Sequence, residues 1–185
     1  MIIASQKRRD NIAEYLLYMW QIEDIIRAYS LNIERIERDI IAPMQLPAEQ
    51  HRQVVEWYES LIDMMRREEV TESGHLQINL NIIIQLDDLH RAVMADDRFA
   101  DYHRAYYGIL PLIVELRARA GAEPKGEIET CFNALYGMLL MRLRHQAVSA
   151  DTAAAIERIC SFIALLSKYF HLDEAHQLFR DEPQE

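Results

Sequence analysis

The sequence predicts an all-α protein, an irregular bundle of about six helices in a single domain. Hydrophobic residues recur every three or four positions over long stretches, which is the repeat of one helix face. Gly and Pro number only five each, so few turns interrupt these stretches. The length of 185 residues suits one domain, which we expect to span residues 1–171. The polar, acidic segment 172–185 is expected to be a frayed C-terminal tail.

The first helices are expected on both sides of a proline-containing link. A helix over residues 6–29 has the central run YLLYMW, which is apolar on nearly all sides and predicts a central place in the bundle. A weaker helical pattern follows over residues 30–41. Pro43 and Pro47 then interrupt the chain, because proline lacks the amide hydrogen and disfavours a helix before it. Pro47 suits the first turn of the next helix, which we expect to end near residue 67.

Four further helices are expected in the remainder of the chain. The first covers residues 76–95, and the second covers residues 97–120. Pro111 lies inside the second of these helices and should kink or divide it. A third covers residues 125–146, and the last begins after Ser149, a side chain that is favourable as an N-cap.

Charge and composition exclude several classes of partner. The net charge of −10 disfavours general binding to DNA or to anionic lipid, since such binding depends on neutralising phosphates. No stretch approaches the roughly 20 apolar residues that span a bilayer, and the charged N-terminus does not resemble a signal peptide. We therefore expect a cytoplasmic protein. Cys131 and Cys160 lie in apolar helical segments, where we expect reduced, buried thiols.

Four segments of the chain resemble a known protein family. They are QKRRDNIAEYLLYMWQIEDIIRA over residues 6–28, GHLQIN over 74–79, AYYGILPLIVELRA over 105–118 and EIETCFNALYGMLL over 127–140. Together they resemble an uncharacterised, all-helical family of bacterial proteins found mainly in Bacteroidota, a domain of unknown function. The resemblance covers most of the chain and implies a cytosolic helical fold. It implies no activity, and it provides no catalytic residues.

Arg98 and His103 form the first candidate site. Their spacing resembles the R-x4–6-H signature of the HEPN ribonucleases, which are helical and usually dimeric. In that family the arginine and the histidine act on the scissile phosphate and the 2′-hydroxyl of RNA without a metal ion. HEPN motifs usually place a polar residue directly after the arginine, whereas Phe99 stands at that position here. Pairs at this spacing also arise by chance, so an ordinary pair on a helix surface is the alternative interpretation.

Asp87 and His90 form the second candidate site, for a metal ion. Their i, i+3 spacing places both side chains on one helix face, and Glu72 and His75 lie in the preceding turn. Helical bundles can hold di-metal centres, but these use a Glu from each of two helices and a Glu-x-x-His motif from each of two others. Glu72 and His75 form only one such motif, and it spans Ser73-Gly74, where a regular helix is doubtful. We therefore expect no bound metal and no other cofactor.

Polar residues within apolar segments form the third candidate site. Glu23 and Arg27 are four residues apart with the acid first, the favourable order for an ion pair on a helix. Glu23 continues an apolar row and is expected to enter the interior, where a pocket around the pair could hold a small molecule. Asn133 is expected to face a helix interface. The alternative interpretation is that these groups only fix the register of packed helices.

These observations favour a function in protein association. The adjacent residues Tyr106 and Tyr107 point to different sides of one helix, so burying both rings requires broad cover by the chain or by a second subunit. We expect a non-enzymatic, cytoplasmic helical protein-interaction module that forms a homodimer or another homo-oligomer. The alternatives are a HEPN-type ribonuclease that needs no metal, and a bundle that binds a small ligand or a metal ion.

Overall fold

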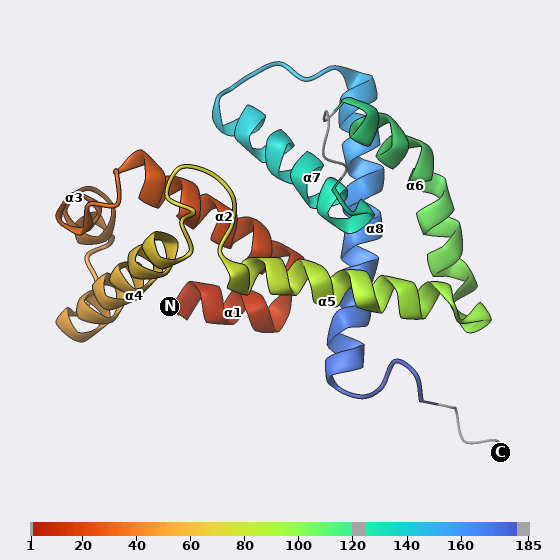
Figure 1. Ribbon diagram of the computed structural model, residues 1–185, viewed down its shortest axis with the longest axis horizontal. Helices are drawn as coiled ribbons and strands as arrows, with labels where there is room; N and C mark the ends of the chain where they lie inside the picture. Colours follow the sequence, from red (N-terminus) through yellow and green to blue (C-terminus); the bar gives the residue numbers. More distant parts are fainter. Residues whose placement is uncertain (1, 120–124, 181–185) are drawn as a thin grey trace. The chain divides into compact units, whose positions relative to one another are not determined.

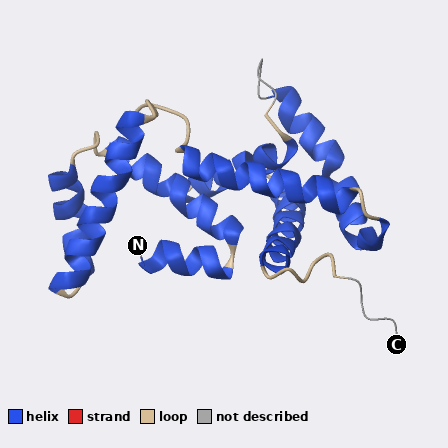
Figure 2. Ribbon diagram, turned by 60° about the horizontal axis from the view of Figure 1, so that its bottom comes forward, coloured by secondary structure: helices blue, strands red, loops and turns tan. Residues whose placement is uncertain are grey.

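The structure is a computed structural model that describes residues 2–119 and 125–180, and it is all-α (Figures 1 and 2). No strand occurs among these described residues. They form eight α-helices rather than about six: α1 (Ile2–Asp10), α2 (Ile12–Ala28), α3 (Ile33–Ile36), α4 (Ala48–Arg67), α5 (Gln77–Met94), α6 (Ala100–Arg119), α7 (Glu127–Leu143) and α8 (Ala150–Glu174). Within these segments, no helix has the length and apolar character needed to cross a membrane.

The expected helix over residues 6–29 is divided at Asn11, so that prediction is wrong. The Asn11 side chain accepts a hydrogen bond from the backbone amide of Ala13 (3.0 Å), as the N-cap of a new helix does. Its Oδ1 atom also accepts a hydrogen bond from the hydroxyl of Ser167 (2.9 Å). A short amide side chain that bonds to the backbone competes with the helix, and here it ends α1 and starts α2.

The weakly patterned segment 30–41 is helical only in part. Asn32 caps α3 by accepting from the amide of Arg35 (2.8 Å). The chain then widens into a π-helix over Glu37–Ile41 and tightens into a 3-10 helix over Ala42–Met44. Two isoleucines of this segment, Ile36 and Ile41, are fully buried, so burial rather than a regular helix repeat determines its path.

The later helices begin close to the predicted positions. Pro47 directly precedes α4, and Ser149 caps α8 by accepting from the amide of Thr152 (3.2 Å). Pro111 does not divide α6, whose ribbon bends between its two ends in Figure 1. The first turn that was expected for α6 is instead a 3-10 helix over Asp97–Phe99. The predicted end of this helix at residue 120 lies outside the described residues.

The chain forms two compact units, and their boundary falls within α5. The first comprises Met1–Asp10 and Glu14–Ile82, and the second comprises Asn11–Ala13 and Ile83–Glu185. The core of the first includes these fully or almost fully buried side chains: Leu16, Met19, Trp20, Ile26, Ile36, Leu61 and Met65. In the second, α6, α7 and α8 pack on one another around Tyr102, Ile113, Ile128, Phe132, Phe162 and Leu166. The single domain expected from the chain length stays a prediction.

Two expectations about exposure and length need correction. Cys131 is buried as expected, but Cys160 is exposed on α8. The last helix continues to Glu174, beyond the boundary predicted at residue 171. After it, the ring of Phe179 packs edge-on against that of Phe99, with 5.6 Å between the centroids. Residues 181–185 of the predicted tail lie outside the described part.

Asn11→Ala should lower the free energy of unfolding by about 1 kcal/mol, because it removes the cap of α2. It also removes the acceptor of the Ser167 hydroxyl. Urea unfolding followed by circular dichroism measures the change. The matched control is Asn133→Ala, an exposed asparagine inside α7, which should stay within about 0.5 kcal/mol of the wild type. Equal effects of the two substitutions would contradict the capping role.

Candidate functional site

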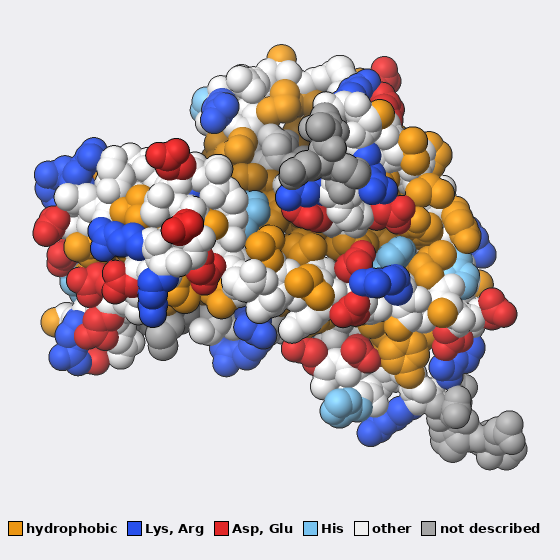
Figure 3. All heavy atoms as spheres, viewed as in Figure 1, with side chains coloured by type: hydrophobic (Ala, Val, Ile, Leu, Met, Phe, Trp, Pro, Cys, Tyr) orange, Lys and Arg blue, Asp and Glu red, His pale blue; other side chains and the backbone are white. Residues whose placement is uncertain are grey.

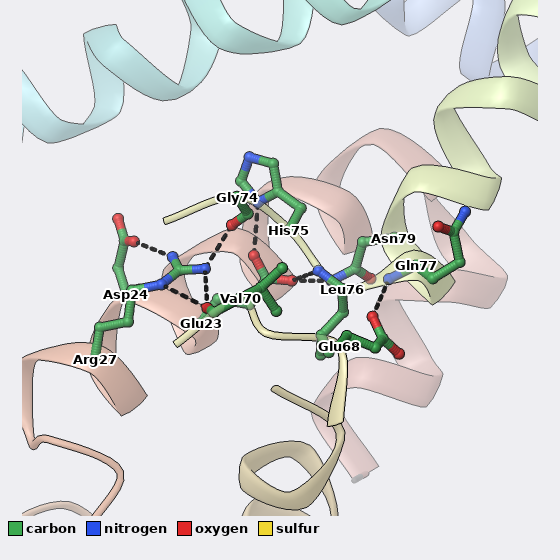
Figure 4. A network of polar contacts seen from close by, with 10 residues as sticks. All are labelled: Glu23, Asp24, Arg27, Glu68, Val70, Gly74, His75, Leu76, Gln77 and Asn79. Atoms are coloured by element: carbon green, nitrogen blue, oxygen red, sulfur yellow. Dashed lines mark hydrogen bonds and ion pairs between the residues drawn. The ribbon is translucent and has the colours of Figure 1, made fainter. Parts of the chain in front are cut away.

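Glu23 is the central residue of a buried polar network in the first unit (Figure 4). Its side chain lies on α2 and is fully inaccessible to solvent. Oε2 accepts a hydrogen bond from His75 Nδ1 (2.6 Å), and Oε1 accepts from the amide of Leu76 (3.0 Å) and from Asn79 Nδ2 (2.6 Å). A buried carboxylate is very costly without donors, and here three donors from one segment surround it.

The network also completes the N-terminal end of α5. The first amides of a helix have no partner within the helix, and an anion near them is favourable. The first turn of α5 contains no acidic residue. Glu23 binds the amide of Leu76, and Glu68 binds the amide of Gln77 (2.6 Å). Carboxylates from elsewhere in the chain therefore cap α5.

Arg27 belongs to the same network but does not pair with Glu23 as predicted. It forms an ion pair with Asp24 (2.9 Å) and donates hydrogen bonds to the carbonyls of Val70 (3.2 Å) and Gly74. The link between α4 and α5 is thus tied to α2 at several points. The His75 ring, in addition, stacks on Trp20 with 4.1 Å between the centroids. Because protein donors already occupy both oxygens of Glu23, the network supports a structural role.

His90 is the centre of a second buried group, in the second unit. Its Nδ1 atom and the Tyr102 hydroxyl share a hydrogen bond of 2.8 Å. The ring lies 4.8 Å from that of Tyr106, whose hydroxyl donates to Glu127 Oε2 (2.6 Å). Burial lowers the pKa of His90, since the protonated imidazole would lose its hydration. Burial, together with Glu127, raises the pKa of Tyr106.

The predicted metal ligands Asp87 and His90 have other partners. The Asp87 carboxylate pairs with Arg91 (2.8 Å), and His90 binds Tyr102. His75, suggested with Glu72, binds Glu23. Across residues 2–119 and 125–180, no group of three or more His, Cys, Asp or Glu side chains is arranged to hold a metal ion.

Arg98 and His103 both lie near the junction of α5 and α6. The Arg98 guanidinium binds the Asp96 carboxylate (2.7 Å), and His103 Nε2 donates to the carbonyl of Val93 (3.1 Å). Hydrogen bonds from Arg98, and more weakly the charge of His103, hold the pKa of Asp96 below its usual value. An acid thus lies beside both residues of the suggested ribonuclease pair, which disfavours a phosphate at that point.

Asn133 is exposed on α7, so the expectation that it faces a helix interface is wrong. The apolar spacing from Phe132 to Leu135 does not determine on which side of the helix the Asn133 side chain lies. Phe132 itself is fully buried, and the neighbouring position along the chain points to a different side of the helix.

The outer face of α6 extends beyond the tyrosine pair that the sequence singled out. Tyr107 and Val114 are each 60% exposed, and Pro111 between them is also exposed. Their spacing of four and three residues places them on one side of the helix. Tyr106, in contrast, is buried. Hydrophobic side chains gather along the outer edge of α6 in Figure 3. We call the exposed positions of this side the α6 face: Ala100, Arg104, Tyr107, Pro111, Val114 and Ala118.

Exposed charges accompany the α6 face near both of its ends. Arg104 pairs with Asp101 (3.1 Å) in the first half of the helix, and Arg119 pairs with Glu115 (2.5 Å) in the second half. All four side chains are largely exposed. An apolar centre with charged ends is the arrangement of a small protein interface, in which the rim is polar. The α6 face is therefore the candidate interaction surface.

Glu23→Gln should destabilise the fold by about 2 kcal/mol, because an amide cannot accept from all three donors and hydrogen bonds to a buried charge are strong. Urea unfolding measures the loss, and hydrogen exchange at the first amides of α5 should accelerate. The matched control Glu59→Gln changes an exposed carboxylate of α4 and should have little effect. Unchanged exchange at Leu76 and Gln77 in the Glu23 variant would exclude the capping role.

His90 should make the second unit less stable in mild acid. Its folded pKa lies below the ordinary 6.5, so the unfolded chain takes up its proton first. The contribution of neutral His90 to the free energy of unfolding is complete above pH 6.5. It is lost as the pH falls through the pKa of His90 in the folded protein. The free energy of unfolding changes by at most about 1.4 kcal/mol per pH unit when one proton is taken up. Thermal unfolding between pH 7.5 and pH 5 measures it. His90→Gln should flatten this dependence, and His145→Gln, at an exposed position, should not.

Comparison with known proteins identifies the family of the chain. The family model described as Domain of unknown function (DUF4924) matches residues 1–177. This match confirms the resemblance to an uncharacterised family that the sequence segments carry. Neither a curated protein nor a solved structure matches the chain. The chain therefore belongs to the family of the domain of unknown function DUF4924.

Proposed function

We propose that this protein is a non-enzymatic, cytoplasmic helical protein-interaction module that works as a homo-oligomer and associates through the α6 face. The single observation that carries the proposal is the exposure of Tyr107 and Val114 on one side of α6, with Pro111 between them. Single exposed apolar residues are normal on protein surfaces. Three on consecutive turns of one helix form a continuous apolar strip, and burying an apolar side chain contributes roughly 1.5–3 kcal/mol.

The surroundings of the reactive side chains support a non-enzymatic role. Burial raises the pKa of the Cys131 thiol to about 12, which keeps it from acting as a nucleophile at neutral pH. The imidazoles of His75, His90 and His103 each have a hydrogen-bond partner within the fold. A cytoplasmic location is supported by the free thiols of Cys131 and Cys160, because reducing compartments keep cysteines unpaired.

Val114→Lys tests the proposal through the oligomeric state. The wild type should form a dimer whose population grows with concentration in sedimentation velocity. The variant should raise the dissociation constant at least tenfold, because it places two lysines in the apolar centre of the interface. The matched control Leu143→Lys changes an equally exposed apolar residue, 62% accessible, on α7 and should leave the dimer intact. Circular dichroism checks that both variants are folded.

Two results would contradict the proposal. The first is a wild-type protein that stays monomeric up to millimolar concentration. The second is a dimer that Val114→Lys and Leu143→Lys weaken equally, which would place the interface elsewhere.

A further inference from the structure

We infer that two copies of this chain pair through α6 in antiparallel order, with Arg104 facing Glu115 of the partner subunit and Asp101 facing Arg119 of the partner subunit. This inference rests on the proposed function and adds the orientation and register of the contact. It depends on three properties of α6: the spacing of its exposed positions, the symmetry of that spacing, and the side of the helix on which the charges lie.

The exposed positions of the α6 face follow a repeat of 3.5 residues. Successive members are separated by four, three, four, three and four residues, as are the contact positions of two paired helices. The helix has 20 residues and is therefore about 30 Å long. A second helix can lie along such a strip, because the strip stays on one side of α6.

The spacing reads the same from both ends of the helix, which makes the face self-complementary. When the two strips are laid antiparallel, Ala100 meets Ala118 of the partner subunit and Tyr107 meets Pro111 of the partner subunit. Arg104 then meets Val114 of the partner subunit, where its aliphatic stem can cover the valine. A two-fold axis near the centre of the helix produces each of these contacts twice, as an isologous interface requires.

The charges favour the antiparallel order. At about 100° per residue, Asp101, Glu115 and Arg119 lie on the same flank of the α6 face. In a two-fold antiparallel pair the same flanks of both helices meet. The register then brings Arg104 beside Glu115 of the partner subunit and Asp101 beside Arg119 of the partner subunit, so each contact joins opposite charges. In a parallel two-fold pair opposite flanks of the two helices meet instead, so the charges of this one flank would not face one another.

Charge reversal at Arg104 and Glu115 tests the register. Arg104→Glu should weaken the dimer roughly tenfold at low salt, since it places a new carboxylate against Glu115 of the partner subunit in both contacts, and Glu115→Arg should act likewise. The double variant Arg104→Glu with Glu115→Arg should return the dissociation constant to within about threefold of the wild type. Arg142→Glu on α7 changes the net charge as Arg104→Glu does and should have little effect.

The outcomes separate the register from the proposed function. If the single variants weaken the dimer and the double variant does not restore it, or if none of the three changes it, the antiparallel register is wrong. The proposed function still stands in both cases when Val114→Lys dissociates the dimer. If the wild type is monomeric, the proposed function fails, and the register fails with it.

Discussion

The buried carboxylate of Glu23 is the interaction on which the order of the first unit depends. Removing a charge from water is so costly that donors must be present wherever the charge is buried. Here the donors come from His75, Leu76 and Asn79, so the start of α5 must lie against α2. The same contact supplies the anion that the first turn of α5 lacks. One side chain thus satisfies two requirements, the pairing of a buried charge and the capping of a helix.

Much of the helical content was predictable because it depends on local patterns, whereas the division at Asn11 was missed. The apolar rows, together with Pro47 and Ser149, define where most helices lie and where two of them begin. Asn11 does carry a local signal, because an asparagine followed three residues later by Glu14, just before an apolar run, is typical of a helix start. The Asn11 side chain also accepts a hydrogen bond from Ser167, 156 residues away in the sequence. A contact so distant along the chain cannot be read from a local repeat.

The candidate sites show the same limit. Sequence spacing predicted Arg27 as the ion-pair partner of Glu23, because spacing compares only residues of one helix. The expectation that Glu23 enters the interior agrees with its burial. The true partners of Glu23 come from a different segment. The first turn of α5 has no acid of its own, so a carboxylate from elsewhere in the chain is favourable there. On α6, apolar residues occur on all sides, so the sequence could not decide that Tyr106 is buried and Tyr107 exposed.

Pro111 connects the fold of α6 to the strength expected of its interface. Proline has no amide hydrogen for the carbonyl of Tyr107, four residues earlier, and a missing bond of this kind is best tolerated on the solvent side of a bent helix. Ile109 and Ile113 then pack on the inner side, against the rest of the second unit. Two bent helices that meet at their outer sides approach most closely at the centre and separate toward the ends. The apolar residues Tyr107, Pro111 and Val114 lie at that centre, and long charged side chains lie toward the ends, where they can span a wider gap. Such a contact buries less area than two straight helices would. It therefore belongs among the small interfaces, below about 1,200 Å² in total, that join partners reversibly.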